Sequence, residues 1–120
     1  MKNFKKLLIW QKGFDIAVKS FLFVKLLPSE ERFGLSSQIT RAAVSISANI
    51  AEGSSRSSLK DFNRFLEISL GSCFELETHL LLAETLIGND NELLMFLLKQ
   101  LDEEQKMLMS FMNKIASKLS

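Results

Sequence analysis

The sequence is poor in residues that interrupt a helix or cross-link a chain. Its 120 residues include one proline, five glycines, one cysteine and no tyrosine. So few breakers predict long, uninterrupted elements. The single cysteine, Cys73, excludes an internal disulfide, which suits a reducing compartment. The single histidine, His79, leaves little material for imidazole-based catalysis.

A long apolar run is also missing. The chain starts with a basic segment followed by apolar residues, as a signal peptide does, but the apolar run Leu7–Trp10 has only four residues. A secretory signal needs about 7–15 apolar residues, and a membrane-spanning helix needs about 18. We therefore expect a cytoplasmic protein with no targeting segment and no membrane partner.

The chain as a whole has almost no net charge, but individual segments of it have a clear excess of one sign. The net charge is +1, which argues against a generic nucleic-acid binder. Residues 1–28 nevertheless hold six lysines and one aspartate, whereas residues 65–104 hold one lysine and nine acids. Two interpretations remain open: the opposite charges pair inside one molecule, or they match across neighbouring subunits.

The strongest pattern in the sequence is the helical spacing of its apolar residues. Apolar residues make up 47% of the chain and charged residues 24%, enough for the core of one domain. Apolar residues recur every three or four positions in four segments joined by short connections. We predict an all-α, up-down-up-down four-helix bundle forming a single domain over residues 1–120. The expected helices cover about residues 7–27, 35–52, 58–87 and 90–118.

Individual stripes predict which helix faces are buried. In the first helix the predicted buried stripe is Trp10, Phe14, Ala17, Phe21 and Val24. The third helix has a wider apolar arc, which predicts cover on more than one side. Its main stripe is Phe62, Leu66, Ser69, Cys73, Leu76, Leu80, Ala83 and Ile87, and a second stripe is Phe65, Ile68, Ser72, His79, Leu82 and Leu86.

Glycines and capping residues mark the expected helix ends. Gly71, in the middle of the third helix, costs about 1 kcal/mol relative to alanine, which close approach by another helix would offset. The predicted helix ends are a left-handed Gly53 after the second helix, Ser58 with Asp61 before the third, Gly88 after it, and Asn89 with Glu92 before the fourth.

Residues suited to catalysis or metal binding are few. Di-metal sites in helical bundles use repeated Glu-x-x-His motifs, but Glu75 lies four residues before His79, not three. That pair favours a polar contact along the helix. Cys73 sits on an apolar stripe, which favours a role as small core filler. We expect no catalytic residue, no metal, no cofactor and no enzymatic activity.

The polar side of the second helix is the most unusual segment. Gln38, Arg41, Ser45, Asn49 and Glu52 are spaced 3, 4, 4 and 3 residues apart, so they share one face. Their side chains are rich in hydrogen-bonding groups and include no lysine. This favours an interface or a partly buried polar network over an ordinary solvated face.

The same segment carries a family resemblance. The block Arg41–Gly53, followed by Arg56, resembles the signature of 23S rRNA intervening sequence proteins, also called S23 ribosomal proteins. Further matches are Trp10-Gln11-Lys12, Gln38, Phe65-Leu66, Gly71-Ser72 and Glu75-Leu76-Glu77-Thr78. The chain departs from the family pattern at Thr40, Ser47 and Ser55.

The resemblance implies a bacterial homo-oligomer, typically a homopentamer with cyclic symmetry. It also implies a relation to the accessory protein of diversity-generating retroelements, which binds nucleic acid and a reverse transcriptase. We therefore expect a non-enzymatic, ring-forming scaffold or adaptor. The alternative is a direct RNA- or DNA-binding protein, accessory to a reverse transcriptase or rRNA, or part of a nucleoprotein. The candidate nucleic-acid contacts are Lys2, Lys5, Lys6, Lys12, Arg41 and Arg56.

Overall fold

Four long helices account for most of the chain. The computed structural model describes residues 3–31 and 33–119, and the candidate contact Lys2 lies outside them. Over these ranges the secondary structure is helical with no strand, which confirms the all-α prediction. The elements are η1 (Phe4–Lys6), α1 (Leu8–Val24), η2 (Ser29–Glu31), α2 (Leu35–Ser54), α3 (Leu59–Ile87) and α4 (Glu92–Leu119).

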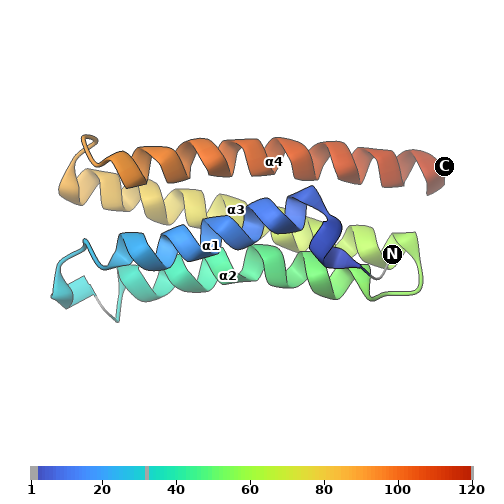
Figure 1. The fold of residues 1–120 in the computed structure, drawn as a ribbon, viewed down its shortest axis with the longest axis horizontal. Helices are drawn as coiled ribbons and strands as arrows, with labels where there is room; N and C mark the ends of the chain where they lie inside the picture. Colours follow the sequence, from blue (N-terminus) through green and yellow to red (C-terminus); the bar gives the residue numbers. More distant parts are fainter. Residues whose placement is uncertain (1–2, 32, 120) are drawn as a thin grey trace.

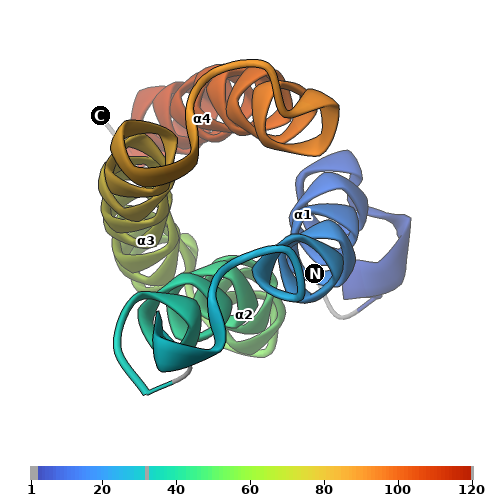
Figure 2. The same cartoon turned by 90° about the vertical axis from the view of Figure 1, so that its left-hand side faces the viewer.

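The helices alternate in direction and lie side by side around a common core (Figures 1 and 2). Each helix packs against the next one in the chain, and α4 packs against α1, which closes the arrangement of four helices. Among the described residues, α1 makes no contact with α3, because the two helices lie diagonally across the core (Figure 2). The molecule measures 47 × 21 × 20 Å.

The predicted buried stripe of α1 is wrong, because the face that is buried is rotated partway around the helix from the predicted one. Phe14 and Phe21 are 51% and 50% exposed. α1 is apolar around most of its circumference, so periodicity alone does not choose the inner face. Small residues let α1 approach α2 and α4 closely, and the buried positions are Ile9, Gly13, Ile16, Ala17, Ser20 and Phe23.

The main stripe of α3 is predicted correctly. From Phe62 to Ala83 all seven of its members are buried, and Ile87 packs against the core while partly exposed. Ser69, the polar member of this stripe, donates to the carbonyl oxygen of Ile46 at 2.8 Å. The stripe is therefore the contact surface of α3 with α2 and the core.

Two of the four expected helix ends are confirmed. The hydroxyl of Ser58 accepts a hydrogen bond from the backbone N–H of Asp61 at 3.1 Å and caps α3. Gly88 ends α3 with a φ of 88°, a conformation that favours glycine.

The other two ends differ from the sequence-based prediction. Gly53 is not a left-handed cap but a buried residue inside α2, where α3 crosses so closely that a methyl group would lie 2.6 Å from Cβ of Phe65. The N-cap of α4 is Asn91 instead of Asn89, and its Oδ1 accepts from the backbone N–H of Leu94 at 2.9 Å. No helix in residues 3–31 or 33–119 is long and apolar enough to cross a membrane.

Candidate functional site

The middle of the polar stripe of α2 is hydrogen-bonded to α3. The hydroxyls of Ser45 and Ser72 are 2.7 Å apart. Asn49 donates from Nδ2 to the carbonyl oxygen and the hydroxyl of Ser45, at 2.8 and 2.9 Å. Ser72 is 8% exposed, so these bonds are largely shielded from water. Ser45 and Asn49 therefore serve the contact between the two helices.

The ends of the same stripe are exposed. Glu52 accepts a hydrogen bond from Arg56 at 3.0 Å, and the Arg56 guanidinium lies 4.7 Å from the centre of the Phe65 ring. In the described residues no group bonds the side chain of Gln38 or of Arg41. The structure thus divides the five predicted residues into a helix–helix contact, an ion pair and two exposed, unbonded side chains.

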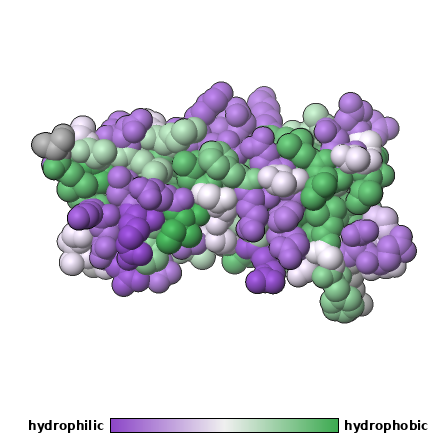
Figure 3. Space-filling model, turned by 180° about the vertical axis from the view of Figure 1, so that it is seen from behind, coloured by the Kyte–Doolittle hydropathy of each residue, from purple (hydrophilic) through white to green (hydrophobic). Residues whose placement is uncertain are grey.

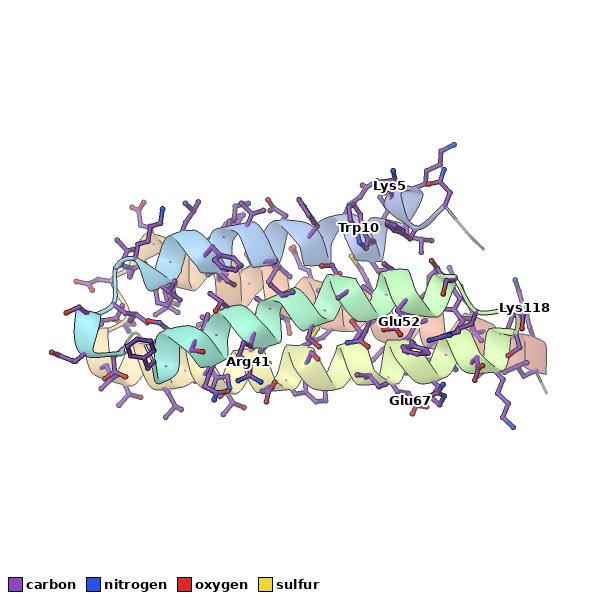
Figure 4. The ribbon with its side chains drawn as sticks, turned by 90° about the horizontal axis from the view of Figure 1, so that it is seen from below. Lys5, Trp10, Arg41, Glu52, Glu67 and Lys118 are labelled. Atoms are coloured by element: carbon purple, nitrogen blue, oxygen red, sulfur yellow. The ribbon has the colours of Figure 1, made fainter. Side chains whose placement is uncertain are left out.

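Arg41 stands above an apolar groove between α1 and α2. Phe21, Thr40, Val44 and Ser45 line this groove with it, around a space of about 370 Å³. Figure 4 shows Arg41 on the outer side of α2, well away from the end of the bundle where Lys5 and Lys118 lie. An unpaired guanidinium beside exposed aromatic and aliphatic groups can bind a carboxylate or a phosphate.

The candidate nucleic-acid contacts do not form one surface. Lys5 and Lys6 lie in η1, at the same end of the bundle as Arg56. Lys12 instead points toward α4 and forms an ion pair with Glu103 at 3.0 Å. With Arg41 in the middle of α2, only three of the five described candidates lie at one end.

Sequence reasoning missed the other cations at this end. Lys6 and Lys114 line one groove, and Lys60 and Arg64 line another beside Leu119. These residues come from the start of α3 and the end of α4, which antiparallel packing brings together. No local motif signals this, but the charge of the last sixteen residues could have suggested it. We define the basic end as Lys5, Lys6, Lys60, Arg64, Lys114 and Lys118.

Among the described residues, α1 and α3 each carry an uncovered apolar face. The sequence predicted cover on more than one side of α3, yet α3 has an exposed outer side (Figure 3). We define the α1 outer face as Phe14, Val18, Phe21 and Leu22, and the α3 outer face as Ile68, Phe74, Leu81, Leu82 and Leu86. All nine side chains are 44–60% exposed, which is unusual for such large apolar groups gathered on two helices.

Cys73 and His79, the two residues weighed for catalysis, are buried and partly buried in the bundle. Cys73 is fully buried, and burial, followed by the charges of Glu104 and Glu77, raises the pKa of its thiol. A protonated thiol is a poor nucleophile. His79 makes no hydrogen bond to Glu75, and its Nε2 has no partner in the described part of the chain. No group of three metal-ligating side chains occurs among the described residues.

Glu104 is the most unusual of these buried groups. Its side chain, on α4, is fully buried, and neither carboxylate oxygen has a hydrogen-bond partner among the described residues. Burial, opposed by the charge of Lys12, raises the pKa of this carboxyl to about 8. Gly13 makes room for it, since a methyl group there would lie 2.9 Å from Oε2 of Glu104.

Comparisons with known proteins give one consistent result. The family model described as "23S rRNA-intervening sequence protein" matches residues 5–110. A crystal structure from Bacteroides thetaiotaomicron, of a protein of unknown function from the S23 ribosomal protein family, is similar at a TM-score of 0.79 and 30% identity. The similarity covers 88% of this chain and 98% of that one. No curated protein matches the chain.

Proposed function

Because the chain belongs to the 23S rRNA-intervening sequence protein family, we propose that it is a non-enzymatic scaffold that assembles into a homo-oligomeric ring. Five subunits is the ring size that the family resemblance implies. The assembled ring presents a composite surface to a nucleic acid or nucleoprotein. The bundle offers a buried, protonated thiol and a lone histidine rather than a catalytic constellation, and this supports a scaffold over an enzyme.

The position of the two uncovered faces carries this proposal. α1 and α3 lie diagonally across the bundle, so their outer faces point in different directions (Figure 2). An interface between two unlike patches is head-to-tail, and repeated head-to-tail contact closes into a ring when the rotation permits. Burying the nine exposed apolar side chains of these faces supplies the driving force.

The charges support the same contact. α1 and α3 do not contact each other inside one molecule, although Lys12 of α1 pairs with Glu103 of α4 at 3.0 Å. Glu67 and Glu75, on the exposed side of α3, have no ion pair among the described residues, and neither has Arg41 or Lys25. Lys25 follows the last residue of α1 and Arg41 lies in the groove beside α1, which supports contact between these cations and acids of a neighbouring subunit.

A mass measurement tests the proposal directly. Light scattering after size exclusion, at micromolar protein concentration, is expected to give a multiple of the 13.6 kDa chain mass. Five chains is the expected multiple. A strict monomer over the micromolar range contradicts the proposal.

Charge reversal on α3 is expected to weaken assembly. Glu75→Lys places a cation opposite the cations of the neighbouring subunit, which costs about 1 kcal/mol, or roughly five-fold in each subunit contact. The concentration at which the ring dissociates is measured by mass photometry or sedimentation. Asp90→Lys, in the exposed turn before α4, is the matched control and should leave that concentration unchanged. Equal behaviour of the two variants argues against a charge-matched interface.

Direct binding of nucleic acid is the second candidate function, and the basic end favours it. Lys5, Lys6, Lys60, Lys114 and Lys118 have no ion pair within the described chain. A ring whose subunits point the same way gathers these lysines on one rim. Clustered cations neutralise phosphates and release counterions, which gives binding its salt dependence.

Salt titration tests this second candidate. Binding of a fluorescent single-stranded RNA is expected to weaken steeply between about 50 and 200 mM salt, as for proteins that neutralise several phosphates. The double variant Lys60→Glu, Lys118→Glu should lower the slope and the affinity. Lys99→Glu, exposed on α4 away from this end, serves as the control. Binding that is unaffected by the double variant rules out the basic end.

A further inference from the structure

Gly71 is out of place in a lone bundle. It lies in the interior of α3, where glycine favours a helix less than any residue except proline. Apart from its two chain neighbours and the nearby backbone of α3 itself, no atom lies within 4 Å of the position that a Cβ of residue 71 would occupy. The residue is also exposed. Close packing within this chain therefore does not explain the glycine. The contrast with Gly53 is sharp, because a methyl group there would meet Phe65 at 2.6 Å.

The surroundings of Gly71 have the shape and chemistry of a receiving site for a side chain. Residues three and four positions away surround it on the helix surface. Ile68 and Phe74 are 45% and 50% exposed, and Glu67 and Glu75 are exposed as well. Together with Gly71 they form a hollow with an apolar base and acidic corners, as in knobs-into-holes packing.

The bundle places Phe14 of α1 at the height of Gly71. A methyl group at Gly13 would lie 3.1 Å from Cγ2 of Ile46, and the carbonyl oxygen of Ile46 accepts a hydrogen bond from Ser69 at 2.8 Å. Gly13 and Ser69 are thus level along the bundle. α1 and α3 run in the same direction (Figure 1), so Phe14 and Gly71, one and two residues further on, lie at similar heights along the bundle.

From this geometry we propose that Phe14 of one copy packs onto α3 of the next copy at Gly71, between Ile68 and Phe74. The inference rests on the proposed ring and names the contact at the centre of its interface. Subunits in a ring with their long axes along the symmetry axis stand at equal height, which brings these two positions together. Phe14 is 51% exposed and stacks on Trp10 with 5.1 Å between ring centres, so it is held in place before assembly.

Charge complementarity identifies a second copy as the occupant. On the side of the bundle that carries Phe14, Arg41 lies in the groove with Phe21 and has no partner within the described residues. Glu67 and Glu75, on either side of Gly71, are unpaired acids. The hydrogen bond between Ser45 and Ser72 sets the antiparallel register of α2 and α3, so Arg41 and Glu75 are also at similar heights. An apolar face with a cation about two helical turns from Phe14 matches an apolar hollow flanked by acids.

A pair of size-exchange substitutions tests the contact. Gly71→Leu fills the hollow and Phe14→Ala removes the knob, and each alone is expected to weaken association at least ten-fold. In the double variant Phe14→Ala, Gly71→Leu, the leucine occupies the space that Phe14 leaves, and at least part of the association is expected to return. Association is measured by sedimentation, and circular dichroism confirms that each variant remains helical.

Matched controls lie on α4, outside the proposed contact. Phe96→Ala removes an aromatic ring that is 46% exposed, and Ser110→Leu adds a leucine to an exposed helical position. Both are expected to associate as the unmodified chain does. Gly71→Ala separates assembly from folding, because it should weaken association while the dilute monomer becomes no less stable.

The outcomes distinguish this inference from the proposed ring. A monomeric unmodified chain removes both. An oligomer that tolerates Gly71→Leu and Phe14→Ala unchanged keeps the ring and overturns the contact. Two disruptive single variants whose combination restores nothing also overturn the pairing of Phe14 with Gly71. If the double variant regains association and both control variants associate as the unmodified chain does, the pairing of Phe14 with Gly71 is supported.

Discussion

Replacing Gly53 by alanine is expected to lower the free energy of unfolding by about 1–2 kcal/mol, although alanine is the better helix former. The added methyl group would lie 2.6 Å from Cβ of Phe65, 3.0 Å from Cδ1 of Phe62 and 3.3 Å from the Phe62 carbonyl oxygen. Two of these atoms are backbone or attached directly to it, so rotating a side chain does not relieve the clash. Overpacking of this kind costs about 1–3 kcal/mol, and the helix-propensity gain of about 1 kcal/mol offsets only part of it.

A larger side chain at the same place should have a larger effect. Gly53→Leu is expected to force α2 and α3 apart near their connection, and a domain with only about 5–15 kcal/mol of total stability tolerates little of this. Urea unfolding followed by circular dichroism measures both variants. Gly71→Ala is the control at a concentration below association, where it should stabilise the monomer by up to about 1 kcal/mol. A Gly53→Ala variant as stable as the unmodified chain would falsify the close crossing of α2 and α3.

Stability is expected to fall as pH rises from about 5 to 8, because of Glu104. The ordinary pKa of this carboxyl is 4.5, and burial raises the pKa to about 8 in the folded chain. Between these values the unfolded chain releases the proton while the folded chain keeps it. Unfolding then becomes easier by about 1.4 kcal/mol for each pH unit. Below pH 4.5 both states are protonated, and above pH 8 both are ionised, so the slope is confined to that window.

Asp15 affects stability at a lower pH than Glu104 does. The pKa of Asp15 is lowered, chiefly by its hydrogen bond from Lys19 and against the effect of burial. Its contribution is present above its ordinary pKa of 3.8 and is lost as pH falls below that value. The effect of Asp15 on stability is therefore confined to acid pH, whereas the effect of Glu104 lies between about pH 4.5 and 8.

Glu104→Gln is expected to remove the pH slope and to stabilise the fold at pH 7 by about 3 kcal/mol. The amide has nearly the same shape and does not have to take up a proton on folding. Urea unfolding at pH 5, 6, 7 and 8 gives the slope directly. Glu103→Gln is the matched control: its side chain is 48% exposed and bonded to Lys12, so it should keep the slope. A flat profile in the unmodified chain contradicts the assignment to Glu104.

Periodicity predicted α3 better than α1 for a physical reason. The main stripe of α3 contrasts with polar residues on the opposite side, so the inner face is marked in the sequence. α1 is apolar at Phe14, Val18 and Phe21 as well as at its buried positions, so several faces fit equally well. The choice was made by Gly13 and Ser20, whose small size lets neighbouring helices come close. Steric fit between helices is a pairwise property, and one helix read alone does not contain it.

The polar stripe of α2 was recognisable, but the roles of its members were not. Spacing placed Arg41 and Ser45 on one face, yet Ser45 bonds α3 and Arg41 stays unbonded within the described chain. Their difference depends on how α3 lies against α2. The same dependence made Gly53 look like a helix cap, when its lack of a side chain serves the crossing of the two helices.

By itself the sequence determined four helices, their approximate ends and the separation of basic and acidic segments, because propensity, capping and charge are carried by local residues. Only the tertiary structure decided that the basic helix α1 and the acidic helix α3 lie diagonally across the bundle. It also decided that cations of η1, α3 and α4 share one end and that Glu104 is buried. These features depend on which helices become neighbours. That choice is made by the packing of all four helices together, through the apolar area they bury and the close contacts their small residues allow.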